Sequence, residues 1–239
     1  MKIIIDTPEK LAQSAAEQYV TLLTNKPDAV LGFATGSTPI GLYQELARRN
    51  KAGEMSFSKA VTFNLDEYIG LDPSHDQSYR YFMNDQLFHH IDIPMENTHV
   101  PSGLGDSDAM AKEYEKMIRQ AGGIDLQLLG IGHDGHIGFN EPGTPFGSFT
   151  HAVDLAERSI QANSRFFASI DDVPRRAVTM GIRTVMNARS IIFIALGEDK
   201  ADIVAETING PVTEAVPASV LQLHPFVSFY LDKGAASKL

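Results

Sequence analysis

The chain has 239 residues, of which 43% are hydrophobic and 21% are charged. This length suits one buried core, so we expect a single domain over residues 1–239. The formal net charge of −10, with scattered Lys and Arg, argues against a nucleic-acid-binding surface. No hydrophobic run approaches the roughly 18 residues of a membrane-spanning helix, and cysteine is absent. We therefore expect a soluble, cytoplasmic protein that binds neither nucleic acid nor membrane and has no disulfides.

Short hydrophobic runs alternate with longer amphipathic segments, which predicts strands and helices around a mostly parallel sheet. The predicted strands are residues 2–5, 29–34, 60–63, 124–131, 177–180, 190–196 and 226–231. The predicted helices begin at Thr7-Pro8 and run to Thr24, begin at Thr38-Pro39, and lie near residues 76–89, 106–120 and 198–208. This order indicates an α/β fold in three αβα layers, with an open, Rossmann-like sheet of about six to seven strands.

The longest stretch without a predicted element runs from residue 132 to about residue 174. Long loops inside compact domains are usually binding loops or lids, so we expect a lid near residues 150–175. Ligands of open α/β sheets bind beyond the carboxyl ends of the strands. The residues that follow each predicted strand are therefore the candidates for a functional site.

The second predicted strand is followed by the small-residue turn Thr35-Gly36-Ser37-Thr38-Pro39, which leads into a helix. Such a turn offers backbone N–H groups, hydroxyls and the positive end of a helix dipole, which together suit a phosphate group. It is not a Walker loop, because no Lys follows the glycine at the required place. An ordinary capped turn would have the same sequence, so both interpretations stay open here.

The third predicted strand is followed by Asp66 and Glu67 within the segment Phe63-Asn64-Leu65-Asp66-Glu67-Tyr68. Carboxylates at a strand end suit a general base. Helix capping or a solvated turn would explain an isolated acidic pair equally well.

The densest chemical segment follows the fourth predicted strand, at residues 130–142. It contains a G-x-G-x-x-G pattern, with Asp154 at a distance suited to a ribose contact, but Gly138 and Pro142 interrupt the helix that a dinucleotide site requires. Metal binding by His133, Asp134 and His136 is not supported by the spacing, so no metal is expected. Proton exchange on a glycine-rich loop remains, and the side chains suited to it are Asp134, His136 and Glu141.

Two cations complete the candidates. Arg165 lies inside the predicted lid, and Lys200 follows the sixth predicted strand at the start of a helix. Arg and Lys both bind phosphate oxygens. Each is equally typical of a solvated surface.

Taken together, five segments resemble the glucosamine-6-phosphate deaminase family, also called the glucosamine/galactosamine-6-phosphate isomerase family. They are residues 35–39, 63–68, 132–142, 163–167 (Asn-Ser-Arg-Phe-Phe) and 221–225 (Leu-Gln-Leu-His-Pro), in the family's order over nearly the whole chain. The resemblance implies a sugar-phosphate substrate and conversion of D-glucosamine 6-phosphate and water into D-fructose 6-phosphate and ammonia. It implies no metal and no organic cofactor.

The resemblance also implies roles for single residues. Asp66 corresponds to the base that moves a proton from C2 to C1, and His136 to the group that opens the sugar ring, with Asp134 and Glu141 orienting it. The implied phosphate ligands are Thr35, Gly36, Ser37, Thr38, Arg165 and Lys200.

Two other functions stay open. The 6-phosphogluconolactonases share the fold and the Asp-Gly-His element, and related folds serve as sugar-phosphate sensors in transcription regulators. The larger, allosterically activated deaminases carry basic residues after the Asn-Glu-Pro element, whereas residues 143–153 contain no Lys or Arg. We therefore expect little or no activation by N-acetylglucosamine 6-phosphate. The sequence leaves a monomer and a homo-oligomer equally open.

Overall fold

The computed structural model describes residues 1–155, 167, 169 and 173–239. Its centre is a seven-stranded sheet in the order β1-β10-β9-β6-β2-β3-β5, in which every neighbouring pair is parallel. The strands are β1 (Lys2–Ile5), β2 (Val30–Phe33), β3 (Val61–Asn64), β5 (Thr98–His99), β6 (Leu126–Leu129), β9 (Ser190–Ala195) and β10 (Val227–Leu231). The predicted parallel sheet is confirmed. Most of the predicted lid, including Arg165, falls outside the described residues.

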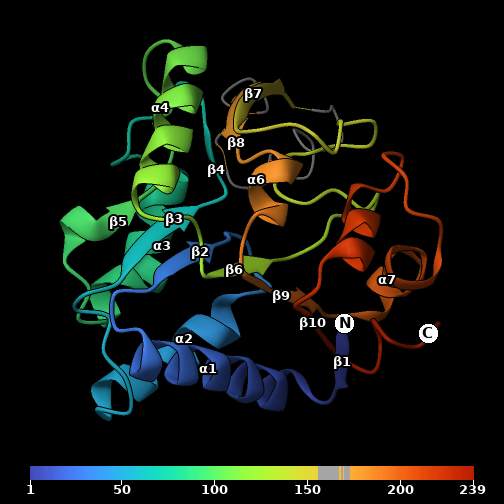
Figure 1. Cartoon of the computed structure of the whole chain (residues 1–239). Coiled ribbons are helices and arrows are strands. Elements are labelled where there is room, and N and C mark those ends of the chain that lie inside the picture. Colours follow the sequence, from blue (N-terminus) through green and yellow to red (C-terminus); the bar gives the residue numbers. More distant parts are fainter. Residues whose placement is uncertain (156–166, 168, 170–172) are drawn as a thin grey trace.

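Helices cover both faces of this sheet. They are α1 (Pro8–Asn25), α2 (Ile40–Lys51), α3 (Tyr79–Gln86), α4 (Ser107–Gln120), α6 (Ile182–Met186) and α7 (Ala201–Asn209), with 3₁₀ turns η1 (Phe88–His90), η2 (Met95–Asn97), η4 (Glu198–Lys200) and η5 (Pro217–Leu223). Figure 1 shows α1 and α2 together on one face and α4, α6 and α7 across the other. The three-layer αβα prediction is therefore confirmed.

The first helix illustrates how the layers pack. Leu11, Ala15 and Tyr19 recur every four residues along α1 and are fully buried, as expected for the inward face of an amphipathic helix. The ring of Tyr19 stacks on Phe33 of β2 at 6.0 Å between centroids. This contact fixes α1 against the centre of the sheet.

A second, three-stranded antiparallel sheet has the order β4-β8-β7. Its strands are β4 (Asp66–Tyr68), β8 (Arg176–Thr179) and β7 (His151–Asp154). The predicted strand at 177–180 therefore belongs to this small sheet and not to the parallel one. The predicted irregular stretch contains β7, and neither β4 nor β5 was predicted, because strands of two to four residues are too short to show an alternating pattern.

Some predicted helix starts were wrong. The structure places the N-cap of α2 at Pro39 and the first helical residue at Ile40, one residue later than predicted. Helix α3 begins at Tyr79 instead of residue 76, since the side chain of Ser78 caps it by accepting from the Tyr81 N–H at 3.0 Å. A 3₁₀ turn precedes α7.

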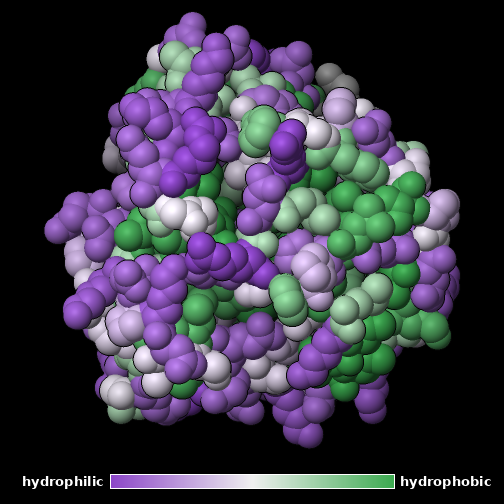
Figure 2. Space-filling model, in the orientation of Figure 1, coloured by the Kyte–Doolittle hydropathy of each residue, from purple (hydrophilic) through white to green (hydrophobic). Residues whose placement is uncertain are grey.

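Hydrophilic side chains cover most of the face shown in Figure 2, with hydrophobic ones gathered toward the side of α7 and the C-terminus. None of the helices in the described part of the chain has the length and apolar character needed to cross a bilayer.

Candidate active site

The phosphate-type turn follows β2 at the carboxyl edge of the sheet. Gly36 has φ = 97°, a conformation that glycine adopts readily. The hydroxyl of Tyr43 on α2 is hydrogen-bonded to both the N–H and the C=O of Ala34, which fixes the chain just before the turn. Among the described residues, none accepts a hydrogen bond from the backbone N–H groups of Gly36, Ser37 or Thr38. These donors are available to an anion.

Asp66 lies where the chain leaves the parallel sheet. Its neighbour Leu65 is held by both sheets, because its N–H donates to Phe33 O at 3.0 Å and its carbonyl accepts from Met180 N. Asp66 is only 6% exposed. Burial and, next in size, the negative charge of Glu67 raise the pKa of Asp66 to about 8, while His136 acts in the opposite direction. Asp66 is thus a base with an affinity for protons near neutral pH.

The imidazole of His136 faces two carboxylates. Its Nδ1 lies 2.7 Å from Asp134 Oδ1 and 3.6 Å from Glu141 Oε2. Burial alone would lower the pKa of His136, but the hydrogen bonds and charges of Asp134 and Glu141 raise it to about 9. The ring packs so closely on Gly132 that a Cβ there would lie 2.0 Å from His136 Cε1. This explains why the loop needs a glycine at that position.

The loop that carries His136 is tied to the small sheet. The N–H of Phe139 donates to Thr179 Oγ1 at 3.1 Å, and Asn140 Nδ2 donates to Met180 O at 2.8 Å. Thr179 pairs with Asp66 across β8 and β4. Strand β8 therefore holds the His136 loop and the Asp66 strand side by side.

These groups share a pocket of about 260 Å³ at the carboxyl edge of the sheet. Five of the predicted site residues line this pocket: Thr35, Gly36, Thr38, Asp66 and His136. Ser37 lines two neighbouring pockets instead. Asp134 and Glu141 lie behind His136, outside the pocket lining but in contact with the imidazole.

Two aromatic residues of the pocket wall were missed by the sequence reasoning. Tyr79 and Phe139 both line the pocket, and their rings are parallel, 6.1 Å apart with an interplanar angle of 6°. Phe139 lies within the glycine-rich loop, so its position was a usable signal. Tyr79 comes from α3, and nothing local in the sequence connects that helix to the site.

Of the two predicted cations, only Lys200 lies in the described residues. Its Nζ donates to the carbonyl of Ile131 at 3.1 Å and to His133 Nδ1 at 3.2 Å. Ile131 lines the pocket, so the ammonium group lies beside the pocket rim.

The metal site and the dinucleotide site that the sequence argued against have different outcomes. His133 pairs with Asp199 at 2.8 Å and does not join Asp134 and His136. Asp134, His136 and Glu141 instead form a group whose ligand atoms lie within 4.8 Å of one another, close enough to hold a metal ion. No helix opens after the glycine pattern, where the chain makes a turn and the bridge Ile137–Asn140, so a dinucleotide site is not supported.

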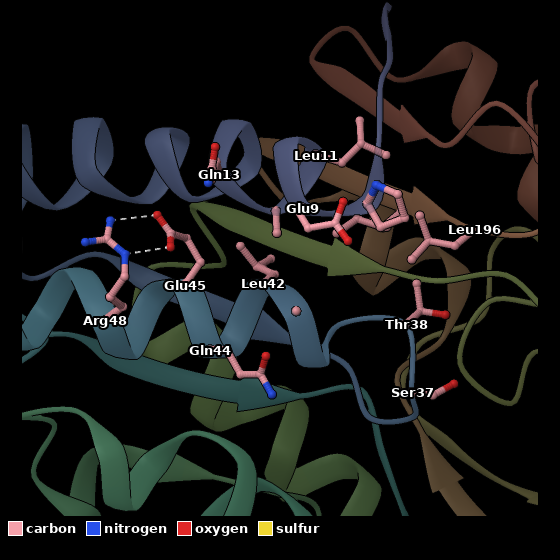
Figure 3. A pocket seen from close by; sticks show the side chains of 14 residues that line it. Glu9, Leu11, Gln13, Ser37, Thr38, Leu42, Gln44, Glu45, Arg48 and Leu196 are labelled. Atoms are coloured by element: carbon pink, nitrogen blue, oxygen red, sulfur yellow. Dashed lines mark hydrogen bonds and ion pairs between the residues drawn. The ribbon is translucent and has the colours of Figure 1, made fainter.

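A larger pocket, of about 460 Å³, lies between α1 and α2. Figure 3 shows Ser37 and Thr38 at one end of it and the Glu45–Arg48 ion pair at the other. The pocket contains neither Asp66 nor His136. The charge of Glu45 is already balanced by Arg48 and Arg49, which hold its pKa at about 2. We therefore place the chemistry in the smaller pocket.

Comparison with known proteins agrees with this geometry. Residues 6–227 match the model of the family described as glucosamine-6-phosphate isomerases/6-phosphogluconolactonase. The chain belongs to this family. It is 53% identical over 237 residues to the glucosamine-6-phosphate deaminase of Hahella chejuensis, covering 99% of this chain and 91% of that protein. The deaminase of Thermoanaerobacter pseudethanolicus is 51% identical, with coverage of 99% and 94%.

Two solved structures resemble the chain to different degrees. A monomeric glucosamine-6-phosphate deaminase superposes with a TM-score of 0.96 at 45% identity, over 100% of both chains. A 6-phosphogluconolactonase from Leishmania guyanensis reaches a TM-score of 0.78 at 20% identity, over 100% of this chain and 98% of that one. The second likeness shows the shared fold alone.

Proposed function

We propose that this chain is a glucosamine-6-phosphate deaminase, which converts D-glucosamine 6-phosphate and water into D-fructose 6-phosphate and ammonia. The observation that carries the proposal is one pocket in which the buried carboxylate of Asp66, the imidazole of His136 and the Gly36 turn meet. Relatives of the chain at about half identity carry the same activity in their names, which supports the proposal.

The phosphate group binds at the turn that begins α2. The N–H groups of Gly36, Ser37 and Thr38 and the positive end of the helix attract the anion, and Lys200 adds a charge from the rim. Arg165, outside the described residues, stays a predicted ligand. Gripping the phosphate fixes the far end of the sugar relative to Asp66, so loss of this anchor lowers turnover as well as affinity.

His136 opens the sugar ring. With its pKa raised to about 9, the imidazole is protonated at neutral pH. It donates a proton to the ring oxygen and takes one from the C1 hydroxyl, which leaves an open-chain aldehyde and restores the imidazolium. Asp134 and Glu141 hold the ring orientation and stabilise its positive charge.

Asp66 then moves the carbon-bound proton. The C2 proton of the open-chain substrate is acidified by the neighbouring aldehyde and ammonium groups, so a well-placed carboxylate removes it. One proton passes from the ammonium group to the C1 oxygen, which gives an enolamine. The enolamine takes back the carbon-bound proton at C1, which leaves a hydroxymethyl group at C1 and an iminium group at C2. Water adds at C2, ammonia leaves, and the ketone remains. The positive ammonium group of the substrate also lowers the pKa of Asp66 on binding, which favours the carboxylate form that the step needs.

The two pKa shifts define a pH window. The reaction needs ionised Asp66, whose pKa is about 8, and protonated His136, whose pKa is about 9. We expect a bell-shaped profile of kcat/KM with its acidic limb near the first value and its alkaline limb near the second, since this ratio reports the free enzyme.

The deciding experiment is an assay of ammonia and fructose 6-phosphate formed from glucosamine 6-phosphate, run beside an assay of 6-phosphogluconolactone hydrolysis. We expect rapid ammonia release and no lactonase activity above background. Faster lactone hydrolysis would favour the other branch of the family, and tight binding of the sugar phosphate without turnover would favour a sensor.

A further inference from the structure

Glu67 is a buried acidic side chain beside Asp66 that the steps above do not use. It is 3% exposed. Glu67 follows Asp66 in β4, so the two side chains point to opposite faces of the strand. The carboxylate of Glu67 accepts three backbone hydrogen bonds of 2.9 Å, from the N–H groups of Tyr68, Tyr79 and Arg80.

Two of these donors open a helix. Tyr79 and Arg80 are the first residues of α3, whose N–H groups have no acceptor within the helix. A carboxylate at this end also meets the positive end of the helix dipole. Ser78 already caps the next N–H, that of Tyr81. Glu67 therefore completes the cap and ties the start of α3 to β4.

The tie determines the position of Tyr79. The ring of Tyr79 lines the pocket together with Asp66 and packs against Tyr68 at 4.8 Å and Phe139 at 6.1 Å. The side chain of Thr35 in the phosphate turn interacts with the Tyr79 hydroxyl. One aromatic side chain thus connects the turn, the His136 loop and the Asp66 strand, and Glu67 anchors its backbone.

We propose that Glu67 is a positioning residue of this pocket: its carboxylate holds Tyr79 in the wall, and its charge acts on the adjacent Asp66. The inference rests on the proposed deaminase function and adds a second acidic residue to it. Glu67 then has two roles: its hydrogen bonds hold the start of α3, and its negative charge acts on Asp66.

The charge acts within a defined set of neighbours. Burial is the largest cause of the raised pKa of Asp66, and the charge of Glu67 is the next. Of the other groups that face Asp66, His136 lowers this pKa, while Tyr68, Tyr79 and Tyr114 surround it as neutral hydroxyls. Arg80 attracts Glu67, but its guanidinium donates to Thr98 Oγ1 and Thr98 O, both at 2.7 Å.

Two substitutions at Glu67 separate the effect of its charge from the effect of its hydrogen bonds to α3. Glu67→Gln keeps the length and removes the charge, and it leaves one oxygen for three N–H groups. Glu67→Asp keeps the charge and shortens the side chain by one methylene, so it no longer reaches α3. We expect Glu67→Gln to shift the acidic limb of the kcat/KM profile to lower pH by on the order of 1 unit. We expect both variants to raise KM several-fold, with the limb unmoved in Glu67→Asp.

Glu115→Gln is the matched control. Glu115 is a buried carboxylate on α4 that accepts from the N–H of Thr150 at 2.9 Å and from the hydroxyls of Thr150 and Thr184. It does not line the pocket. Its substitution therefore loosens packing elsewhere and leaves the acidic limb where the wild-type protein has it.

A titration of the ¹³C-labelled Asp66 carboxyl by NMR, without substrate, separates this inference from the proposed function. If the wild-type protein releases no ammonia, the function fails while the titration still measures the effect of Glu67. An Asp66 pKa that is the same in Glu67→Gln and wild type overturns the inference. If the Gln variant does not fold, Glu67→Asp decides, and an unchanged KM in that variant overturns the role in holding Tyr79.

Discussion

Two buried aspartates lie at opposite edges of the parallel sheet and have opposite properties. Asp125 directly precedes β6 at the amino edge and is 4% exposed, whereas Asp66 follows β3 at the carboxyl edge and is 6% exposed. Their solvent-exposed fractions are therefore alike, although the carboxylate of Asp66 lies deeper among protein atoms. The pKa of Asp125 is nevertheless lowered, and that of Asp66 is raised to about 8.

The difference comes from their partners. Burial raises the pKa of Asp125, but Lys26 Nζ at 2.7 Å, the N–H of Val30 at 2.8 Å and the guanidinium of Arg189 overcome it. Asp66 forms no ion pair with any Lys or Arg of the described residues. Asp125, which has cationic partners, links three segments at the amino ends of the strands. Asp66, which has none among the described residues, can exchange protons at the carboxyl ends.

Removing the charge of each aspartate in turn tests the difference between them. Asp66→Asn removes the base, and general-base contributions run to about 10²–10⁴-fold. We expect kcat for ammonia release to fall by about 10³-fold. Exchange of the C2 proton with deuterated water, followed by NMR, should be lost as well. Asp125→Asn should keep the kcat of the folded protein.

An Asp66→Asn variant that still exchanges the C2 proton would remove that residue from its assigned step. Circular dichroism of both variants is the control, because it separates loss of chemistry from loss of folding.

The second prediction concerns stability and pH. The pKa of Asp66 is raised from an ordinary value of 3.8 to about 8, so the folded protein holds a proton that the unfolded chain has lost. This contribution is fully present below pH 3.8 and is lost as the pH rises toward about 8. Asp66→Asn lacks the effect. Relative to wild type, it should gain stability between pH 5 and pH 8, by at most about 4 kcal/mol.

Urea unfolding of both proteins at the two pH values measures this gain. Equal changes in the two proteins would show that the Asp66 carboxyl is not strained by burial, and the comparison with Asp125 would lose its basis.

The third prediction concerns Asp125, at the amino ends of the strands. Asp125→Asn leaves Lys26 and Arg189 without a negative partner and weakens the hydrogen bond from the Val30 N–H. We expect the free energy of unfolding to fall by about 2 kcal/mol at pH 7, a moderate value because both cations are partly exposed. The loss should shrink as the pH falls from the ordinary pKa of Asp toward the lowered pKa of folded Asp125, because the unfolded wild-type chain takes up a proton first. A loss that stays constant with pH would contradict the ion-pair explanation.

The sequence predicted the ends of the parallel strands well because a buried parallel strand is a hydrophobic run, and the polar segment after it is visible. Asp66 and His136 lie in two such segments, and the family resemblance then implied their roles. The sequence could not predict the three-residue strand β4, which looks like a turn after β3. It also could not predict Tyr79 in the pocket wall, because that position depends on a contact between Glu67 and α3 across 12 residues of chain.

The same limit applies to the amino edge. Asp125 meets Lys26 from 99 residues earlier and Arg189 from 64 residues later. No local pattern distinguishes such an aspartate from one that is left without cations. The sequence motif implied a role for Asp66. The contrast with Asp125 can be seen only from the residues that surround each carboxylate in the structure.

Asp134 differs from both aspartates because it acts on the reaction through His136. Asp134 accepts a hydrogen bond from His136 Nδ1 at 2.7 Å, and this bond is the leading cause that raises the pKa of His136. Asp134→Asn keeps the side-chain shape and removes the charge, so the pKa of His136 should fall. The alkaline limb of the kcat/KM profile should then move to lower pH by on the order of 1 unit, while the acidic limb set by Asp66 stays near its wild-type position. Glu141 still faces the imidazole at 3.6 Å, which keeps the shift partial. If both limbs moved together, the two groups would titrate as one coupled unit, and the separate assignment of acid and base would have to be abandoned.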